Sequence, residues 1–124
     1  MVEQKYFCPS EVALEALSGK WKSTILWILS HGPRRFNQLQ SLLEGVPKQS
    51  LSDRLRELES DGIVHRRQYQ ERPARFEYEL TEDGKELWDV VKQLCMWGKR
   101  RSPHQTFKSE LCVQALLNGA GTNQ

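Results

Sequence analysis

The chain has 124 residues and a mass of 14.5 kDa, which suits a single domain that buries a core of its own. Its composition, 38% hydrophobic and 27% charged, is that of an ordinary soluble globular protein, and its net charge of +2 permits nucleic-acid binding without favouring it. No apolar stretch approaches the roughly 18 residues of a membrane helix, and the first residues lack the features of a signal peptide, so we expect a cytoplasmic protein without a membrane partner.

Two helices are predicted at the start of the chain. The spacing in Cys8-Pro9-Ser10-Glu11 matches a capping box in which cysteine replaces the usual serine and proline takes the first helical position. We expect Gly19 to end this helix and His31-Gly32-Pro33 to end the second. The apolar face of the first helix comprises Val12, Ala13, Ala16 and Leu17. The second helix is more apolar, which indicates burial on several sides. Its apolar residues are Trp21, Ile25, Leu26, Trp27, Ile28 and Leu29.

Two further helices follow, joined by a tight turn at Glu44-Gly45-Val46. The short third helix carries Phe36, Leu39 and Leu42 or Leu43 at helical spacing. The fourth helix has Pro47 near its start and Gly62 as its C-cap. Its inner face comprises Leu51, Leu55 and Leu58.

The hydrophobic period then changes, which predicts two strands. The segment Ile63–Gln70 forms the first strand, Glu71-Arg72-Pro73-Ala74 a polar hairpin tip, and Arg75–Thr81 the second strand. In the second strand one face is predicted to carry Phe76, Tyr78 and Leu80, and the other Arg75, Glu77 and Glu79.

A long helix is predicted after the second strand. Thr81 caps it, and Glu82 and Asp83 lie in its first turn, where acidic groups suit the helix dipole. Its apolar stripe comprises Leu87, Val90, Val91, Leu94 and Trp97, with Trp88 and Cys95 on the flank. Ser102-Pro103 interrupts the helix, and a weaker helix is expected over 107–118.

This order of elements predicts a mainly α (α+β) winged helix-turn-helix fold, in which the third and fourth helices form the helix-turn-helix and the hairpin is a two-stranded wing. We expect residues 1–118 to form one domain and residues 119–124 a flexible tail.

The polar side of the fourth helix carries groups that can read DNA. Gln49, Asp53 and Arg56 fall opposite the leucines. Glutamine can bind adenine, arginine guanine and serine several bases, and aspartate can accept a hydrogen bond from cytosine N4. The N-terminal half of such a helix meets the base edges. The candidate DNA-binding residues of this helix are Lys48, Gln49, Ser50, Ser52, Asp53 and Arg56.

The hairpin adds the candidates Arg72 and Arg75, and the first strand adds Arg66 and Arg67. Such side chains can hold phosphates or enter a minor groove. Two further arginines precede the third helix: Arg34 and Arg35. They either contact phosphate or are solvent-exposed residues without a role in binding.

Acidic residues among these basic groups leave a second interpretation open. Asp53, Glu57 and Glu59 oppose tight nonspecific binding, or simply pair with Arg54 and Arg56. Since any amphipathic helix has a solvated polar face, a winged-helix protein-interaction module without DNA binding is an alternative. The combination of turn, helix, basic hairpin and long final helix favours DNA binding.

Three segments, Cys8–Leu29, Arg34–Arg66 and Arg75–Leu87, resemble the HxlR-type winged helix-turn-helix transcriptional regulators of the MarR-like superfamily. That family begins with Cys-Pro, continues through Gly-Lys-Trp and closes its wing with Tyr-x-Leu-Thr-x-x-Gly. The corresponding residues here are Cys8-Pro9, Gly19-Lys20-Trp21 and Tyr78 to Gly84. The resemblance covers Cys8 to about Trp97 and leaves the segment after Ser102 uncovered.

The resemblance implies a homodimer on an inverted-repeat operator. It also implies that the long helix from Thr81, together with the N-terminal segment, forms the dimer interface. The wing tip departs from the family, which often has Val-Pro-Pro where this chain has Glu71-Arg72-Pro73-Ala74.

Cys8 is a candidate redox-sensing residue. The three cysteines, an odd number in a chain without a signal peptide, indicate free thiols. A thiol at a helix N-cap has a lowered pKa and more of the reactive thiolate; Lys5 would add to this effect and Glu11 would oppose it. The resemblance implies a cysteine that senses electrophiles or oxidants by forming an adduct or an intersubunit disulfide. The alternative is a cysteine that serves only as a cap or as filler, with regulation by a small ligand or by abundance.

The remaining cysteines and the tryptophans favour packing roles. Cys95 is expected in the interface, and Cys112 lies in the weaker last helix, where it could also act as a resolving partner. The tryptophans Trp21, Trp27, Trp88 and Trp97 suit core and dimer packing, although a gap between them could admit a small aromatic effector.

Catalysis, cofactors and metals lack support in the sequence. The Gly19-Lys20 pair lacks the first glycine of a phosphate loop, and no nucleophile elbow or His-Glu-x-x-His pair is present. His31, His65 and His104 are isolated, so a metal-responsive regulator is a minor alternative. We therefore expect no enzyme activity, no cofactor and no metal site.

Overall fold

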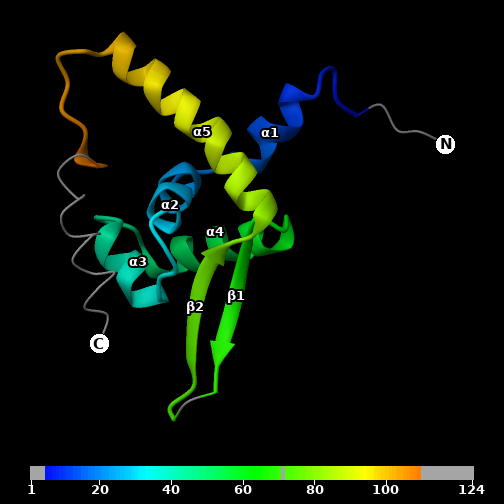
Figure 1. Cartoon of the computed structure of the whole chain (residues 1–124), viewed down its shortest axis with the longest axis vertical. Coiled ribbons are helices and arrows are strands. Elements are labelled where there is room, and N and C mark those ends of the chain that lie inside the picture. The colour runs from blue at the N-terminus through cyan, green and yellow to red at the C-terminus, as the bar shows by residue number, and fades with distance from the viewer. Residues whose placement is uncertain (1–4, 71, 110–124) are drawn as a thin grey trace.

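The computed structural model describes residues 5–70 and 72–109, and its elements follow the order expected for a winged helix-turn-helix (Figure 1). They are α1 (Ser10–Ala16), α2 (Lys22–Leu29), α3 (Phe36–Leu42), α4 (Lys48–Ser60), β1 (Val64–Tyr69), β2 (Arg75–Leu80) and α5 (Glu82–Arg101). The mainly α fold with a two-stranded wing is therefore confirmed. Most of the expected helix over 107–118 and the whole 119–124 tail lie outside the described residues, so the domain limits stay a prediction.

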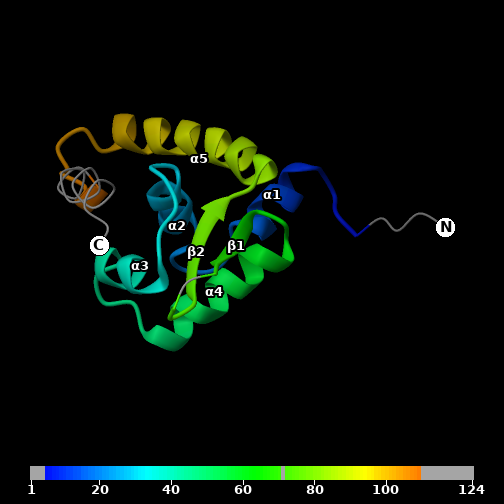
Figure 2. The same ribbon diagram turned by 60° about the horizontal axis from the view of Figure 1, so that its bottom comes forward.

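The core lies around α2, which packs between α5 on one side and α3 and α4 on the other (Figure 2). Its buried residues come from every element except α1. They are Ile25, Leu26, Ile28, Leu29, Leu39, Leu43, Val46, Leu51, Leu55, Leu58, Ile63, Val64, Leu80 and Val91. The expected burial of α2 on several sides is confirmed. Within the described part of the chain, no helix combines the length and apolarity that a membrane span requires.

The hairpin pairs Val64 with Leu80 at its base and Tyr69 with Arg75 near its tip. The segment before α3 extends this sheet by one residue, because Arg34 and Tyr78 exchange backbone hydrogen bonds of 3.0 and 2.8 Å. The free end of the hairpin projects away from the helical body (Figure 1).

Burial along β2 does not follow its two faces. Glu77, on the face predicted to carry Arg75 and Glu79, is only 8% exposed, whereas Phe76 on the opposite face is 39% exposed. The reason is tertiary: the Arg34 segment and α3 lie against β2 and cover Glu77, beside the buried Arg34. Phe76 lies farther out along the wing, where the Arg66 guanidinium is 4.9 Å from its ring centre.

The start of α1 agrees with the capping pattern, whereas the contacts of Cys8 differ from it. Pro9 has helical dihedral angles, φ −58° and ψ −25°, as expected of the first helical position, and the helix continues from Ser10. The Cys8 carbonyl accepts from the Glu11 N–H at 3.0 Å, and the Cys8 thiol lies 2.8 Å from the Ser10 hydroxyl. The Glu11 carboxylate instead accepts a hydrogen bond from the Phe7 N–H at 3.3 Å.

The apolar face of α1 is only partly used within one chain. Ala16 and Leu17 pack against the core, but Val12 is 52% exposed, and Leu14 and Phe7 are also exposed. This short helix therefore presents apolar surface to solvent.

The junction between α4, the hairpin and α5 explains the Thr-x-x-Gly spacing. The Thr81 hydroxyl accepts the Gly84 N–H at 2.9 Å, as expected of an N-cap, and donates to the Gly62 carbonyl at 2.6 Å. The Thr81 N–H donates to the Ile63 carbonyl at 3.0 Å. The Ile63 carbonyl oxygen also leaves no room for a side chain at position 84, because a Cβ on Gly84 would lie 2.1 Å from that oxygen.

Replacing Gly84 with alanine should therefore destabilise the fold. The backbone of Ile63 must move to admit the new methyl group, at a cost of about 1–3 kcal/mol. The change would be measured as the free energy of unfolding in urea at fixed protein concentration.

Gly98→Ala is the matched control, because the same methyl group on the same helix has nothing within 4 Å. It should be neutral or stabilise by up to about 1 kcal/mol through helix propensity. Equal effects of the two substitutions would contradict this account of the junction.

Candidate nucleic-acid interface

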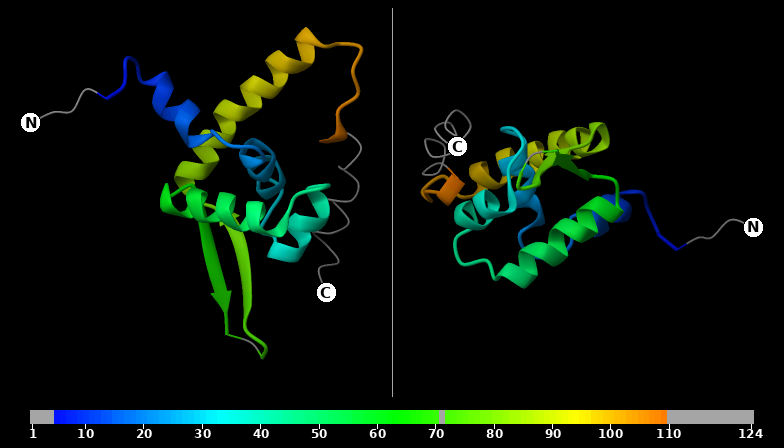
Figure 3. Two further views of the ribbon diagram at one scale, coloured as in Figure 1. Left: turned by 180° about the vertical axis from the view of Figure 1, so that it is seen from behind. Right: turned by 90° about the horizontal axis from the view of Figure 1, so that it is seen from below.

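The second helix of the helix-turn-helix, α4, turns one face to the core and the other to solvent. Leu51, Leu55 and Leu58 are fully buried and hold the helix in place. The turn before it uses Gly45 at φ +81°, a conformation that glycine adopts without strain. In the left-hand view of Figure 3, α4 crosses the body of the molecule and the hairpin projects past it, so both can approach one ligand.

All six DNA-binding residues predicted for this helix lie within α4. Lys48, Gln49 and Arg56 are exposed, and Ser50, Ser52 and Asp53 are half-buried. Four of these residues lie on one face of the helix, because they are spaced by 3, 1 and 3 positions: Gln49, Ser52, Asp53 and Arg56. We call these four residues the polar stripe of α4.

The polar stripe is internally hydrogen-bonded. Gln49 Nε2 donates to Asp53 Oδ1 at 2.9 Å, and Arg56 Nη1 donates to the same oxygen at 3.0 Å. These bonds, first that from Gln49 and then that from Arg56, lower the pKa of Asp53. Asp53 is therefore a carboxylate at neutral pH, paired within the helix.

A second network ties α4 to the start of α2 and was missed by sequence reasoning. The Lys22 side chain is buried, and its Nζ lies 3.0 Å from Glu57 Oε1, with Arg54 Nε 3.1 Å from the same oxygen. Arg54 also packs against Gly19, where an added Cβ would be 3.1 Å from its Nη1. The i, i+3 spacing of Arg54 and Glu57 signals their pair, but nothing in the sequence signals Lys22.

The arginines of the wing differ in what they can offer a ligand. Arg72 is exposed at the tip. Arg75 lies with its guanidinium 4.5 Å from the Tyr69 ring centre, so it is held against the hairpin. Arg67 is partly neutralised, because its Nη2 is 2.9 Å from Glu79 Oε2. Of these three arginines, Arg72 at the tip is therefore the most accessible to a ligand.

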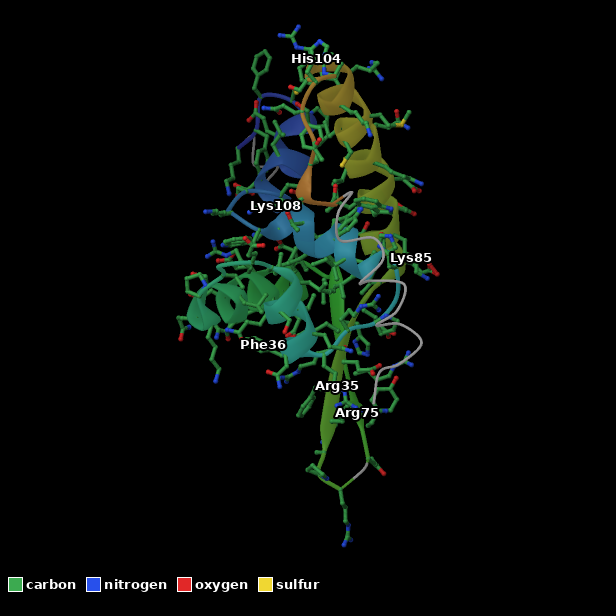
Figure 4. The ribbon with its side chains drawn as sticks, turned by 90° about the vertical axis from the view of Figure 1, so that its left-hand side faces the viewer. Arg35, Phe36, Arg75, Lys85, His104 and Lys108 are labelled. Atoms are coloured by element: carbon green, nitrogen blue, oxygen red, sulfur yellow. The ribbon has the colours of Figure 1, made fainter. Side chains whose placement is uncertain are left out.

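Of the two arginines before α3, only Arg35 can reach a ligand. Arg34 is buried, donates to the Pro33 carbonyl at 2.8 Å, and has a pKa lowered by burial. Its role is structural, which excludes it as a phosphate contact. Arg35 is half-buried, and Figure 4 shows it on the same side of the molecule as Arg75.

Cys8 is half-buried just before α1, with its Sγ 2.8 Å from Ser10 Oγ. The Ser10 hydroxyl lowers the pKa of the Cys8 thiol most, and the backbone amides of Ser10 and Glu11 in the first turn lower it further, so the expected direction holds. Lys5, expected to help, lies 3.8 Å from Glu15 instead. Cys112 lies outside the described residues.

A cavity of about 870 Å³ opens between α2 and α5 and is bounded by residues 107–109. Trp21, Trp27 and Trp88 contribute aromatic walls, and Cys95 also lines it. The charged groups around it are Lys20, Lys92, Lys108 and Glu44. Figure 4 shows Lys108 in the segment that returns from α5 toward α2. In residues 5–70 and 72–109, no three histidine, cysteine or acidic side chains gather in a way that could hold a metal ion.

Large apolar side chains also remain exposed along α5. Val91 is buried, but four others are exposed: Val90, Leu94, Met96 and Trp97. We call these four residues, together with Phe7, Val12 and Leu14, the apolar surface of α1 and α5.

Comparison with known proteins agrees with this architecture. The model of the HxlR-like helix-turn-helix family matches residues 16–106. An HTH-type transcriptional regulator of Methanothermobacter thermautotrophicus is 40% identical over 110 residues, which cover 89% of this chain and 84% of that protein.

Solved structures of two regulators are similar over most of their length. The redox regulator HypR in its reduced form has a TM-score of 0.72 and 39% identity, covering 75% of this chain and 92% of that one. The reduced transcriptional regulator YodB from Bacillus subtilis has a TM-score of 0.71 and 31% identity, covering 81% of this chain and all of that one. HypR in its oxidised form and diamide-treated YodB have TM-scores of 0.70 and 0.67.

Glu57→Gln should weaken the anchor of α4 in a pH-dependent way. The pKa of Glu57 lies below its ordinary 4.5, chiefly because Lys22 hydrogen-bonds to the carboxylate. A group with a depressed folded-state pKa stabilises the fold above its unfolded pKa, and this stability is lost as the pH falls through the folded pKa. We expect a cost near neutral pH of about 1 kcal/mol, because Glu57 is 46% exposed and water screens the pair.

Urea unfolding at neutral pH and well below the pKa of Glu57 would measure this difference, which should shrink in acid. Glu59→Gln is the control on the same helix. Glu59 lies as far as 4.0 Å from the exposed Arg66, so its substitution should cost less stability. A cost for Glu57→Gln that does not depend on pH would contradict the ionic origin of the anchor.

Proposed function

The chain belongs to the HxlR-like helix-turn-helix family of transcriptional regulators, and we propose that it acts as a homodimer that recognises an inverted-repeat operator. The observation that carries this proposal is the polar stripe of α4, which faces solvent beside a projecting basic hairpin. The family membership makes the protein a DNA-binding regulator rather than an enzyme. The operator, the dimer and the switch are the parts proposed here.

In the proposed complex, the N-terminal half of α4 enters the major groove. Gln49 has the donor and acceptor that adenine requires, and Arg56 can make a bidentate contact with guanine. Lys48 and the first amides of α4 suit a phosphate. Arg72 at the wing tip reaches the neighbouring backbone or minor groove, and Arg75 and Arg35 lie closer to the body.

The apolar surface of α1 and α5 supports the homodimer. Burying these side chains against a second copy removes apolar area from water, which is the main driving force of association. A two-fold dimer presents its two α4 helices to half-sites one helical turn apart, about 10 base pairs, so the operator should repeat in inverted orientation.

A thiol switch at Cys8 is supported by the partial exposure of the thiol and by its lowered pKa, both of which favour reactive thiolate. HypR is a redox regulator solved in reduced and oxidised forms, and YodB has been solved after treatment with diamide. We propose that oxidation or alkylation of Cys8 moves α1. The segment after α1 contacts Arg54 at Gly19 and Glu57 through Lys22, so a displacement there reaches α4.

A small aromatic effector is the alternative switch, and the cavity between α2 and α5 favours it. Its tryptophan walls suit an aromatic ring, and its lysines suit an acidic group. Regulation by abundance alone needs neither site. A winged-helix protein-interaction module without DNA binding is a further alternative, and the dependence of DNA binding on salt separates it from the proposal.

Arg56→Ala should weaken binding to the selected operator roughly ten- to hundredfold while affecting random DNA much less, because a base contact discriminates and a phosphate contact does not. The operator would first be obtained by selecting bound sequences from random DNA. Affinities for operator and random duplexes would then be measured by fluorescence anisotropy over a range of salt concentrations.

Lys85→Ala serves as the charge-matched control, since Lys85 lies in the first turn of α5 and pairs with Glu82 (Figure 4). Equal loss on operator and random DNA would make Arg56 a phosphate contact. Failure of the wild-type protein to bind DNA at low salt would reject the proposed function in favour of the interaction module.

Cys8→Ser should make operator binding insensitive to diamide, whereas the wild-type affinity should change at least about fivefold, the lower range of allosteric coupling. Serine keeps the hydrogen-bonding geometry beside Ser10 but cannot be oxidised by a disulfide-forming reagent. Cys95→Ser controls for the other described cysteine. A wild-type protein that ignores diamide, or a Cys8→Ser variant that still responds, would favour the effector alternative.

A further inference from the structure

Asp53 occupies a central place in the polar stripe of α4. It lies one turn after Gln49 and almost one turn before Arg56, and a single oxygen, Oδ1, accepts hydrogen bonds from both at 2.9 and 3.0 Å. Both partners are exposed candidates for base contact, whereas Asp53 is half-buried between them. The carboxylate that was expected to read cytosine is thus already engaged by its neighbours.

From this arrangement we infer that Asp53 is a positioning residue for base recognition, which orients Gln49 and Arg56 before DNA arrives. The inference rests on the proposed function, in which α4 reads an operator, and it changes the part that Asp53 plays in that reading. Its carboxylate contributes specificity through two other side chains rather than through a base of its own.

The effect on Gln49 follows from the chemistry of the two groups. A carboxylate can only accept hydrogen bonds, so the amide must turn its NH₂ group toward Asp53 and its oxygen away. A free glutamine amide can exchange the positions of these two groups by a half-turn of its last torsion and so match more than one base edge. The tied amide keeps one order, an acceptor beside its remaining N–H, which is the pattern that adenine requires.

The effect on Arg56 is similar. One of its N–H groups is held by Asp53, and the side chain is otherwise long, exposed and flexible. Fixing it reduces the conformational entropy that it would lose on binding. The remaining N–H groups of the guanidinium stay available for a bidentate contact with guanine or a phosphate.

The same carboxylate has an electrostatic cost. A negative charge on the DNA-facing side of α4 repels the phosphates of any sequence, so it lowers affinity for random and specific DNA alike. Asp53 should therefore raise the ratio of specific to random binding while lowering random binding. A residue needed only for folding would not produce this pair of opposite effects.

The test compares wild-type protein with Asp53→Ala and Asp53→Asn on selected operator and random duplexes. Asp53→Ala should reduce the ratio of the two affinities about tenfold, with random DNA bound as tightly as before or more tightly. Asp53→Asn should recover part of the ratio, since its amide oxygen can still accept from Gln49 and Arg56. Asp61→Ala, which removes the same charge at the C-cap of α4, should leave the ratio unchanged.

Selection from random DNA adds a second readout. Sequences selected by Asp53→Ala should become degenerate at the base positions that Gln49→Ala and Arg56→Ala also relax. An unchanged sequence preference in Asp53→Ala, or equal loss on operator and random DNA, would overturn the inference while leaving the proposed function intact. A wild-type protein with no sequence preference would instead reject the proposed function itself, and the inference with it.

Discussion

The ion pair between Lys22 and Glu57 ties α4 to the start of α2 and, with the buried leucines of α4, sets the position of that helix. Lys22 is only 4% exposed, and the Glu57 carboxylate 3.0 Å away offsets part of the cost of burying its charge. The pair joins the first turn of α2 to the last turn of α4, on the side of α4 that its leucines do not cover. Arg54 also pairs with Glu57 and packs beside Gly19. The orientation of α4 relative to the rest of the domain therefore depends on this ion pair as well as on apolar packing.

The cluster also connects two surfaces that would otherwise be independent. The residues between α1 and α2 contact α4 on one side and continue into α1 on the other. The apolar surface of α1 and α5 and the polar stripe of α4 are built from different helices. The connection from Leu17 to Lys22 is short, with Gly19 against Arg54 and Lys22 paired with Glu57, so the displacement proposed at Cys8 would be transmitted to α4.

Most charged residues of α4 are paired with other side chains of this protein in the absence of a ligand. Asp53 holds two candidate base contacts, and Glu57 holds Arg54 and Lys22. Asp53 and Glu57, whose charges oppose tight DNA binding, are therefore the groups that hold nearby polar and cationic side chains in place. The charge left free to meet phosphate lies mainly at the start of α4 and at the tip of the wing.

The sequence by itself determined the order of elements, the inward leucines of α4, the Thr81 cap and the polar stripe, because these depend on residues within one or two turns of each other. It also carried the family, through short motifs. Only the tertiary structure decided that Arg34 and Glu77 are buried, that Lys22 anchors α4 and that Gly84 has no room for a side chain. Each of these depends on contacts between segments distant in the chain, whose geometry no local pattern records.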